Sequence, residues 1–356
     1  MALLKSSRLT PALVAAAALV VTAAGCGGKA TETPAGGSGP AAAGSSAQAS
    51  GSAKKGSDYP NKAIEFVVPL PAGGGTDVAA RVIAKALSKE LGVPVNVVNK
   101  PGGNQIPGVM SVLMAKPDGY TLLAEGAAFS SLHALVEDLP YKLEERTFIA
   151  RISVAPHAYF VNGKSPWNTL QEAIEAAKKD PASFSWTYLG GNTTTDFSLL
   201  QLFDVAGIDV AKTKRVPFQG SGPGVQAVAG GHVQFGAAGA SAVFSLRKSG
   251  DLKVLAVTGA KRLPALEDVA TTAELGYPGA DMTWWVGISG PKGLPQDVVD
   301  RLAAAAQKVA QDPEVAKELE AVGAYPSYLG PEDTRNYVLK EADMFKTLAA
   351  KVGTTK

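Results

Sequence analysis

The sequence predicts an α/β fold built on a parallel β-sheet. Three short apolar stretches with strand composition, residues 64–68, 93–99 and 120–124, alternate with two segments of helical spacing, residues 77–91 and 106–115. This alternation is typical of βαβ units, whose strands run in one direction. The loops that follow the strands then meet at one edge of the sheet, where open α/β proteins usually bind their ligands.

The first strand leads into a glycine-rich turn and the N-terminus of a helix. Residues 64–81 are IEFVVPLPAGGGTDVAAR, and the prolines and glycines in the middle favour a sharp turn. A helix N-terminus presents free N–H groups and a partial positive charge, which suit a carboxylate or another anion. The ligand contacts expected here are Pro71, Ala72, Gly73, Gly74, Thr76 and Asp77. The alternative, a turn that serves only the geometry of the fold, stays open.

Asp77 would repel an anionic ligand unless its charge were occupied elsewhere. We expect it to cap the helix and to contact the ligand indirectly. Two nucleotide-binding motifs are excluded in this turn. A P-loop needs Lys and Ser/Thr after its last glycine, where this chain has Thr76 and Asp77, and the dinucleotide fingerprint needs a third glycine where Val78 stands.

Residues 1–25 predict a secretory signal peptide. Lys5 and Arg8 give a basic start, residues 13–21 form an apolar core too short to favour a membrane span, and small residues follow. The sequence AAGC at 23–26 resembles a bacterial lipobox, which makes Cys26 the expected lipidation site. The protein would then be extracytoplasmic and lipid-anchored to the cell membrane, in the periplasm or at the cell surface. The alternative is a chance cysteine after a plain signal peptide.

Residues 26–57 combine the lipidated cysteine with a Gly, Ala and Ser-rich stretch, which predicts a flexible linker. Without Lys5 and Arg8 the 34 basic residues of the chain become 32, equal to the 32 acidic residues. A neutral mature chain gives no indication of a nucleic-acid partner. Cys26 is the only cysteine, so intramolecular disulfides and cysteine-rich metal sites are excluded.

Two later turns repeat the pattern of the first. A predicted strand at 184–189 is followed by a glycine and threonine-rich turn and a helix, and a strand near 216–218 by the turn QGSGP. The ligand contacts expected in these turns are Gly191, Asn192, Thr194, Thr195, Gly220 and Ser221. Two facing helix N-termini could bind the two ends of a small anion. The alternative for the threonines is that they only cap the helix.

Several ordered blocks resemble one family. YPNKAIEFVVPLPAGGGTDVAAR, LGVPVNVVNKPGG, PDGYTLL, LPY, VPFQGSGPGVQAVAGGHV, LKVLAVTGAKRLPALEDVATTAELGYPG and GPKGLP are similar to the receptors of tripartite tricarboxylate transporters, also called the Bug family of extracytoplasmic solute-binding proteins. The resemblance covers residues 59–356. It implies a two-lobed periplasmic-binding-protein fold of type II, with two hinge strands and the ligand in the cleft between the lobes.

The lobes expected from this resemblance are residues 58–158 with 285–356, and residues 159–284. The chain would cross near 157–161 and return near 284–288. The family's partners are a small organic acid and the membrane permease subunits of the transporter. No cofactor is expected, and we expect a monomer.

The chain departs from its family at positions where a polar group is common. It has Ala127, Ala128 and Phe129 in place of a Gly-Thr-His-like run, Phe197 in place of a histidine, and Ala238 in place of an aspartate. If Ala128, Phe129, Phe197 and Ala238 face the cleft, the ligand should have an apolar or aromatic body, because unpaired polar groups cost roughly 1–3 kcal/mol each. The alternative is drift at positions that do not touch the ligand.

The sequence gives little support for catalysis. Its three histidines, His133, His157 and His232, lack the spacing of metal ligands, and no Gly-x-Ser-x-Gly elbow is present. The leading hypothesis is a receptor that binds a small organic carboxylate by lobe closure and delivers it to a tripartite permease. A partner of a membrane sensor kinase comes second, and an extracytoplasmic hydrolase third.

Overall fold

The computed structural model describes residues 58–136, 138–191 and 193–352. The predicted signal peptide, the lipidation site at Cys26, the linker up to residue 57 and the ligand contact at Asn192 lie outside these residues. No helix in this described part of the chain is both long enough and apolar enough to cross a bilayer.

The first half of the fold is the βαβ arrangement that the sequence predicts. Its elements are β1 (Ile64–Val68), α1 (Gly75–Leu91), β2 (Val95–Asn99), α2 (Ile106–Leu113), β3 (Thr121–Glu125) and α3 (Ala127–Leu135). Strand β1 pairs in parallel with both β2 and β3. Phe66, Val67 and Val68 are fully buried, since β1 lies inside the sheet and helices cover both of its faces, and this explains the continuous apolar run.

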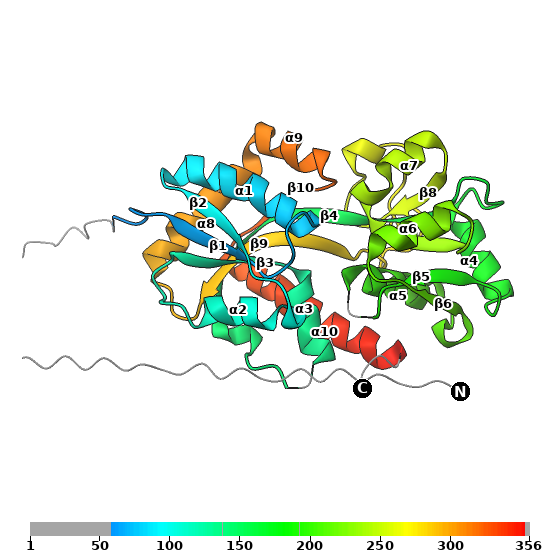
Figure 1. Ribbon diagram of the computed structural model, residues 1–356, viewed down its shortest axis with the longest axis horizontal. Coiled ribbons are helices and arrows are strands. Elements are labelled where there is room, and N and C mark those ends of the chain that lie inside the picture. The colour runs from blue at the N-terminus through cyan, green and yellow to red at the C-terminus, as the bar shows by residue number, and fades with distance from the viewer. Residues whose placement is uncertain (1–57, 137, 192, 353–356) are drawn as a thin grey trace, which may run out of the picture. The chain divides into compact units, whose positions relative to one another are not determined.

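Two long antiparallel strands connect this group of strands with a second one. Strand β4 (Arg146–Asn162) pairs along its first part with β9 (Thr283–Pro291) and along its last part with β7 (Phe235–Gly239) and β8 (Leu252–Val257). Strand β9 also pairs with β3. Figure 1 shows β4 and β9 running between the two groups. The two hinge strands expected from the resemblance are therefore β4 and β9.

The second group repeats the alternation of strands and helices. Its remaining elements are α4 (Leu170–Lys179), β5 (Ser185–Tyr188), α5 (Thr194–Ala206), β6 (Lys214–Pro217), α6 (Ser221–Ala229) and α7 (Phe244–Ser249). Strand β5 pairs in parallel with β6 and β7. As in the first group, the loops after parallel strands meet at one edge of the sheet.

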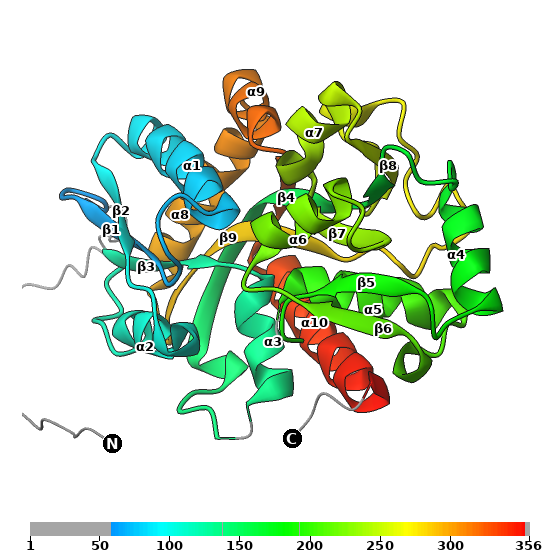
Figure 2. The same cartoon turned by 45° about the vertical axis from the view of Figure 1, so that its right-hand side comes forward.

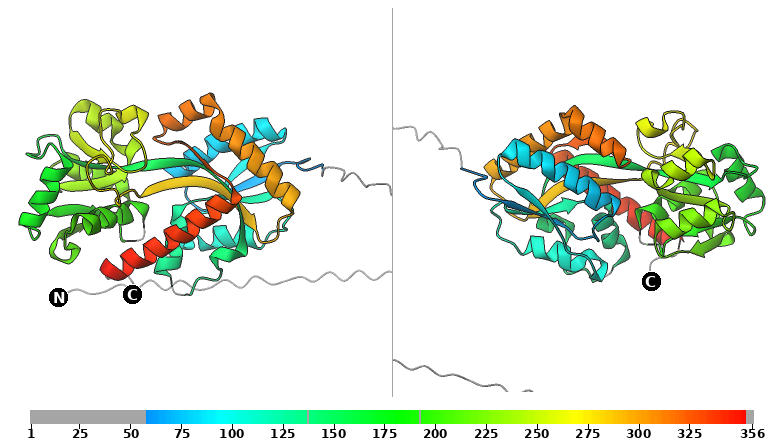
Figure 3. Two further views of the ribbon diagram at one scale, coloured as in Figure 1. Left: turned by 180° about the vertical axis from the view of Figure 1, so that it is seen from behind. Right: turned by 45° about the horizontal axis from the view of Figure 1, so that its top comes forward.

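The C-terminal segment returns to the first group and also contacts the second. It contains α8 (Gln296–Gln311), α9 (Pro313–Ala321), β10 (Tyr325–Leu329) and α10 (Pro331–Val352). Helix α10 packs on α3 and on α5 (Figures 2 and 3). Its Phe345 meets Phe197 of α5 edge to face at 4.5 Å, and its Lys351 binds Asp204 of α5 at 2.8 Å.

The structure corrects several element boundaries. Helix α1 begins two residues earlier than predicted because Gly74, not a polar residue, is its N-cap. The amphipathic pattern of residues 167–179 predicts a helix that begins at Trp167, but α4 begins three residues later because Thr169 and Glu172 form a capping box. The sequence did not predict α3, α9 or β10, nor the full length of β4, whose apolar pattern is interrupted by Arg146, Arg151 and His157.

A buried ion pair fixes the end of β3. Glu125, its last residue, accepts two hydrogen bonds from Nη1 of Arg146 at 2.8 and 2.9 Å and one from Oγ of Ser289 at 2.6 Å. Both charged side chains are fully buried. The pair thus joins β3, β4 and β9 directly beneath the start of α3.

Arg146→Met keeps most of the side-chain volume but leaves Glu125 buried without its cation. We expect a loss of about 3–5 kcal/mol in the free energy of unfolding, measured by urea denaturation. The double variant E125Q/R146M should recover part of this loss because it removes both charges.

The matched control is Lys85→Met. It breaks the exposed pair of Lys85 with Glu318, 2.7 Å apart, and should cost less than about 1 kcal/mol. Equal losses of unfolding free energy in the Arg146 and Lys85 variants would show that the buried pair contributes no more to stability than the exposed one.

Candidate functional site

A cavity of about 380 Å³ lies where the two strand groups meet. It is lined by Leu70, Gly75, Thr76, Gln105, Gly126, Ala127, Ala128, Phe129, His157, Thr193, Thr194, Thr195, Ser221, Gly239, Ser241, Ala242, Trp284 and Trp285. None of these described residues is Lys, Arg, Asp or Glu. The polar groups that a ligand meets are therefore hydroxyls, an amide, an imidazole and backbone atoms.

Four α-helices of the described chain begin at this cavity. Its lining includes Gly75 and Thr76 at the start of α1, Ala127 and Ala128 at the start of α3, Thr194 and Thr195 at the start of α5, and Ser221 at the start of α6. The first N–H groups of each helix have no partner within the helix, and each helix end carries partial positive charge.

Three of these helices begin without a side-chain cap. The N-caps of α1, α3 and α6 are Gly74, Gly126 and Gly220, which have no side chain to accept a hydrogen bond from the helix. Only α5 has such a cap, in which Oγ1 of Thr193 accepts from the N–H of Asp196. Donors that a capping residue usually satisfies are thus left for a ligand.

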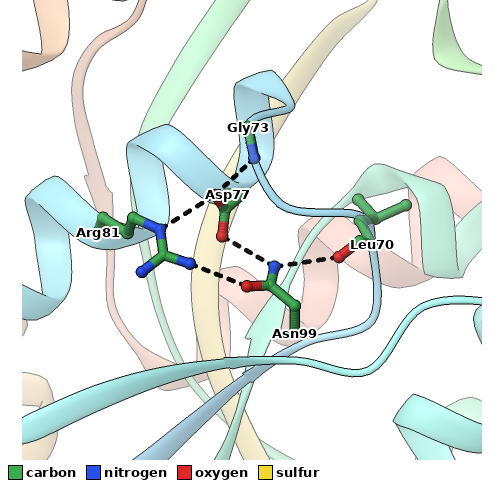
Figure 4. Close-up of polar contacts among 5 residues, drawn as sticks. All are labelled: Leu70, Gly73, Asp77, Arg81 and Asn99. Carbon is green, nitrogen blue, oxygen red and sulfur yellow. Dashed lines mark hydrogen bonds and ion pairs between the residues drawn. The ribbon is translucent and has the colours of Figure 1, made fainter.

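A network centred on Asp77 holds the loop between β1 and α1 (Figure 4). One carboxylate oxygen accepts from the N–H of Gly73 at 2.8 Å and from Nε of Arg81 at 3.0 Å, and the other accepts from the amide of Asn99 at 2.8 Å. The same amide donates to the carbonyl of Leu70 at 3.1 Å. The loop that carries Leu70 and Thr76 to the cavity is thereby fastened to the end of β2.

The structure corrects the role expected for Asp77. This residue is not the N-cap but the third residue of α1, and its side chain is buried and turned back toward Gly73. Burial alone would raise the pKa of the Asp77 carboxyl, but the hydrogen bonds from Arg81, Gly73 and Asn99, with the charge of Arg81, hold it below its usual value. Asp77 is therefore ionised and paired, and its charge is compensated locally.

The second group has a matching network around Asp196, the third residue of α5. Its carboxylate accepts from the N–H of Leu189 at 2.7 Å, the N–H of Gly191 at 3.0 Å and the hydroxyl of Thr193 at 2.8 Å. Burial raises the pKa of this carboxyl, and these hydrogen bonds oppose the shift. The loop before α5 is thus fixed by the same device as the loop before α1.

Three aromatic residues belong to the lining, but only Trp284 is half-buried, whereas Phe129 and Trp285 are at most 1% exposed and their side chains pack in the core. Two glycines allow strand β9 to lie close to the starts of α1 and α3. A Cβ on Gly75 would meet the Trp284 ring at 3.1 Å, and one on Gly126 would meet the Trp285 carbonyl at 2.9 Å. Glycine at both positions lets helices α1 and α3 start directly against β9.

His157 lies in the wall of the cavity and is almost fully buried. Its Nδ1 is 3.2 Å from the carbonyl oxygen of Met282, and its Nε2 is 3.3 Å from Oγ1 of Thr194. Burial lowers the pKa of His157 to about 4, opposed by the hydrogen bond to Met282. The imidazole is therefore neutral at physiological pH.

The predicted ligand contacts fall into two sets. Six line the cavity: Thr76, Ala128, Phe129, Thr194, Thr195 and Ser221. The others lie outside its lining: Pro71, Ala72, Gly73, Gly74 and Gly220 on exposed turns, and Asp77, Gly191, Phe197 and Ala238 in buried positions. Phe197 packs against Phe345, and Ala238 lies within β7 beside Ala158 of β4. Their side chains face the core, so the apolar part of the wall is left to Trp284, Ala128 and Ala242.

The sequence-based interpretation missed Gln105, His157, Trp284 and Trp285. The last three lie on β4 and β9, and a strand that crosses between two lobes must pass the cleft. The three residues lie within the predicted crossing segments, 157–161 and 284–288, so the sequence already indicated that they would lie near the cleft. Gln105 has no comparable signal. It adopts a φ of 70°, which is rare outside glycine.

Two groups of strands joined by two hinge strands, with a cavity between them, define a solute-binding protein with the periplasmic-binding-protein fold. Residues 79–354 match the family described as tripartite tricarboxylate transporter family receptor, and the chain belongs to this family. The resemblance found in the sequence is thus confirmed. The family is one of receptors, and the chain is a binding protein and not an enzyme.

Individual relatives agree with this assignment. Protein BugT of Bordetella pertussis is 31% identical over 300 residues, which are 83% of this chain and 90% of BugT. A TctC solute-binding protein from Polaromonas is 30% identical with a TM-score of 0.71, and the match covers 82% of this chain and 99% of that structure. MatC of Rhodopseudomonas palustris, solved with bound malate, is 26% identical with a TM-score of 0.65, over 82% of this chain and 99% of that structure.

A further R. palustris structure holds adipate. It is 26% identical to this chain, with a TM-score of 0.70, and the match covers 83% of this chain and 99% of that structure. Among the described residues of this chain, no cluster of three or more His, Cys, Asp or Glu side chains could hold a metal ion.

The indole ring of Trp285 is directed to Glu341 of α10. The indole N–H donates to Oε1 of Glu341 at 2.9 Å, and burial raises the pKa of Glu341 to about 7, opposed by hydrogen bonds such as that from Trp285. In the unfolded chain this carboxyl has a pKa near 4.5. Between these values the folded state binds more protons, so the contribution of Glu341 to stability falls as the pH rises.

Glu341→Gln should therefore stabilise the protein more at pH 8 than at pH 5. The stabilisation by the substitution grows by up to about 1.4 kcal/mol per pH unit between pH 4.5 and about 7, the pKa values of Glu341 in the unfolded and folded chain. Urea denaturation of the variant and the unchanged protein at both pH values measures it. An effect of the substitution that is the same at both pH values would contradict a raised pKa for Glu341.

Proposed function

We propose that this protein captures a small organic carboxylate outside the cytoplasm and delivers it to the membrane permease of a tripartite transporter. The observation that carries the proposal is the convergence of four helix N-termini, three of them uncapped by a side chain, on a cavity whose described lining contains no charged side chain. Such an environment favours an anion and holds no fixed charge that would repel it.

The size and walls of the cavity indicate the kind of carboxylate. A volume of about 380 Å³ suits a small molecule. Trp284 offers aromatic surface, and Ala128 and Ala242 offer no polar side chain. These contacts support a ligand with an apolar or aromatic body and a carboxylate directed at the helix ends.

Lobe closure is the expected mode of capture. Residues 58–158 with 285–356 would form one lobe and residues 159–284 the other, which follows the two strand groups and their connection by β4 and β9. Helix N-termini from both groups line the same cavity, so a bound anion contacts both. Its affinity is then higher for the closed form, and binding shifts the population toward that form, which the permease can recognise.

The attachment of the receptor also belongs to the proposal. A lipid at Cys26 and a linker up to residue 57 would tether the binding domain to the cell membrane. We expect the domain to act as a monomer. Mass spectrometry of Cys26 in the membrane fraction tests the anchor.

A new negative charge at the start of α3 tests the anion site. Ala128→Asp places a carboxylate at the second residue of this helix, where it should favour the helix by about 0.3–1 kcal/mol. The same charge should repel an anionic ligand and lower its affinity by about tenfold or more. Calorimetric titration with the tightest carboxylate from a thermal-shift screen measures this. In that screen, ligand at about 100 times its Kd adds close to 3 kcal/mol of stability.

Ala128→Asn is the matched control. It has nearly the same shape as the aspartate and no charge, so it should keep more of the affinity. Equal affinity losses in both variants would indicate a steric effect and no anion site. A screen in which adipate, malate, citrate and 3-phenylpropanoate all fail, and only neutral or cationic compounds stabilise the protein, would overturn the proposed function.

A further inference from the structure

The hydroxyl of Thr194 has a fixed direction. Nδ1 of the neutral His157 ring lies 3.2 Å from the carbonyl oxygen of Met282, which can only accept a hydrogen bond. Nδ1 must therefore carry the proton of the ring. Nε2 is then an acceptor, and the neighbouring Thr194 hydroxyl, 3.3 Å away, donates its only proton to it.

The burial of His157 keeps this assignment in place. The side chain is 1% exposed, and its hydrogen-bonding neighbours are the carbonyl of Met282, the hydroxyl of Thr194 and, at its backbone N–H, the hydroxyl of Thr258. None of these groups is a carboxylate that would favour a charged ring. The neutral form with the proton on Nδ1 is thus the one that satisfies the described contacts.

Because its proton is used, Oγ1 of Thr194 has only lone pairs left for the cavity. The backbone N–H of Thr194, the first residue of α5, is a free donor beside it. One residue thus presents a donor and an acceptor next to each other. A carboxylate oxygen fits the N–H, but it would face the lone pairs of Oγ1.

A second acceptor lies on the other strand group. Oε1 of Gln105 is buried and accepts no hydrogen bond within the described chain. Gln105 also lines the cavity, and both it and Asn104 have positive φ angles of 70° and 50°. Positive φ angles are unfavourable for residues other than glycine, so the surrounding structure must hold Asn104 and Gln105 in this conformation. Such strained backbone is common at functional sites.

We infer that the ligand is a carboxylate that also carries a hydrogen-bond donor, a hydroxyl or an N–H group, which donates to Oγ1 of Thr194. This inference rests on the proposed function and specifies the substrate class of the same cavity. The carboxylate binds at the helix N-termini and the donor satisfies the acceptor that His157 creates. A ligand without a donor leaves that acceptor unpaired, and sites built around such a bond discriminate strongly against analogues that lack it.

The test uses two matched sets of acids with the purified protein. Succinate, malate and aspartate form one set, and 3-phenylpropanoate, 3-phenyllactate and phenylalanine form the other. In each set the second acid adds a hydroxyl and the third an ammonium group to the skeleton of the first. Calorimetric titration should show that a donor-bearing acid binds at least tenfold more tightly than its parent, and the tighter of the two identifies the donor.

Thr194→Val and Thr194→Ser separate the hydroxyl from the shape of the side chain. Thr194→Val should reduce the ratio between the donor-bearing acid and its parent to about one, with the affinity for the parent unchanged or higher. Thr194→Ser keeps the hydroxyl and should keep the ratio. His157→Asn can still donate to Met282 but has no acceptor at the position of Nε2, so it frees the Thr194 proton and should raise the affinity for the parent acid.

The outcomes distinguish this inference from the proposed function. Parent and donor-bearing acids that bind equally, with no change of their ratio in Thr194→Val, would overturn the inference and leave the carboxylate receptor intact. The same ratio in Thr194→Val as in the unchanged protein would also overturn it. Failure of every acid in both sets, when neutral compounds bind, would overturn the proposed function and the inference with it.

Discussion

The cavity depends on two buried carboxylates that accept hydrogen bonds from the loops before their own helices. Asp77 and Asp196 occupy the third position of α1 and α5, and each fixes a glycine-containing turn by accepting a backbone N–H, from Gly73 and from Gly191. Each carboxylate lies behind the helix end, away from the lining. The helix N-termini are therefore held in place by negative charges that do not compete with a ligand. Asp77 is balanced by Arg81, whereas Asp196 relies on hydrogen bonds and the start of its helix.

The connection between the strand groups is stiffer than two strands alone would make it. Besides β4 and β9, helix α10 packs on both α3 and α5, through Phe345 against Phe197 and through Lys351 with Asp204. Any rotation of one group against the other has to slide these contacts or pivot about them. The same helix carries Glu341, which supports Trp285 in the cavity wall. Helix α10 thus couples the geometry of the wall to the relative position of the two groups, and the two helices that it touches, α3 and α5, both begin at the cavity.

The part of the site that depends on local backbone pattern was predictable, and the part that depends on distant pairing was not. Glycine-rich turns before helices pointed to Thr76, Thr194 and Ser221, which line the cavity, because strand, turn and helix start lie within about ten residues of each other. Phe197 and Ala238 were misjudged, since a position in an alignment does not show which way a side chain points, and the apolar face of α5 is turned to α10. The ionic core of Glu125 with Arg146 and Ser289 joins residues far apart in the chain, and no local pattern indicates it.

A lining without charged side chains leaves the binding of the carboxylate to backbone groups and the selectivity among acids to neutral side chains. Backbone N–H groups at helix starts bind any carboxylate of suitable reach, because they depend on the course of the chain and not on a particular side chain. We then expect discrimination to depend on the few side chains between the helix ends: the Trp284 ring for the body of the ligand, and the hydroxyl and amide groups for its polar substituents. In this chain His157 turns one of those hydroxyls into an acceptor, although it is itself buried in the wall. Relatives can therefore share the helix N-termini and bind different acids. A substitution at a buried position such as His157 changes whether a hydroxyl in the cavity, such as that of Thr194, donates or accepts a hydrogen bond.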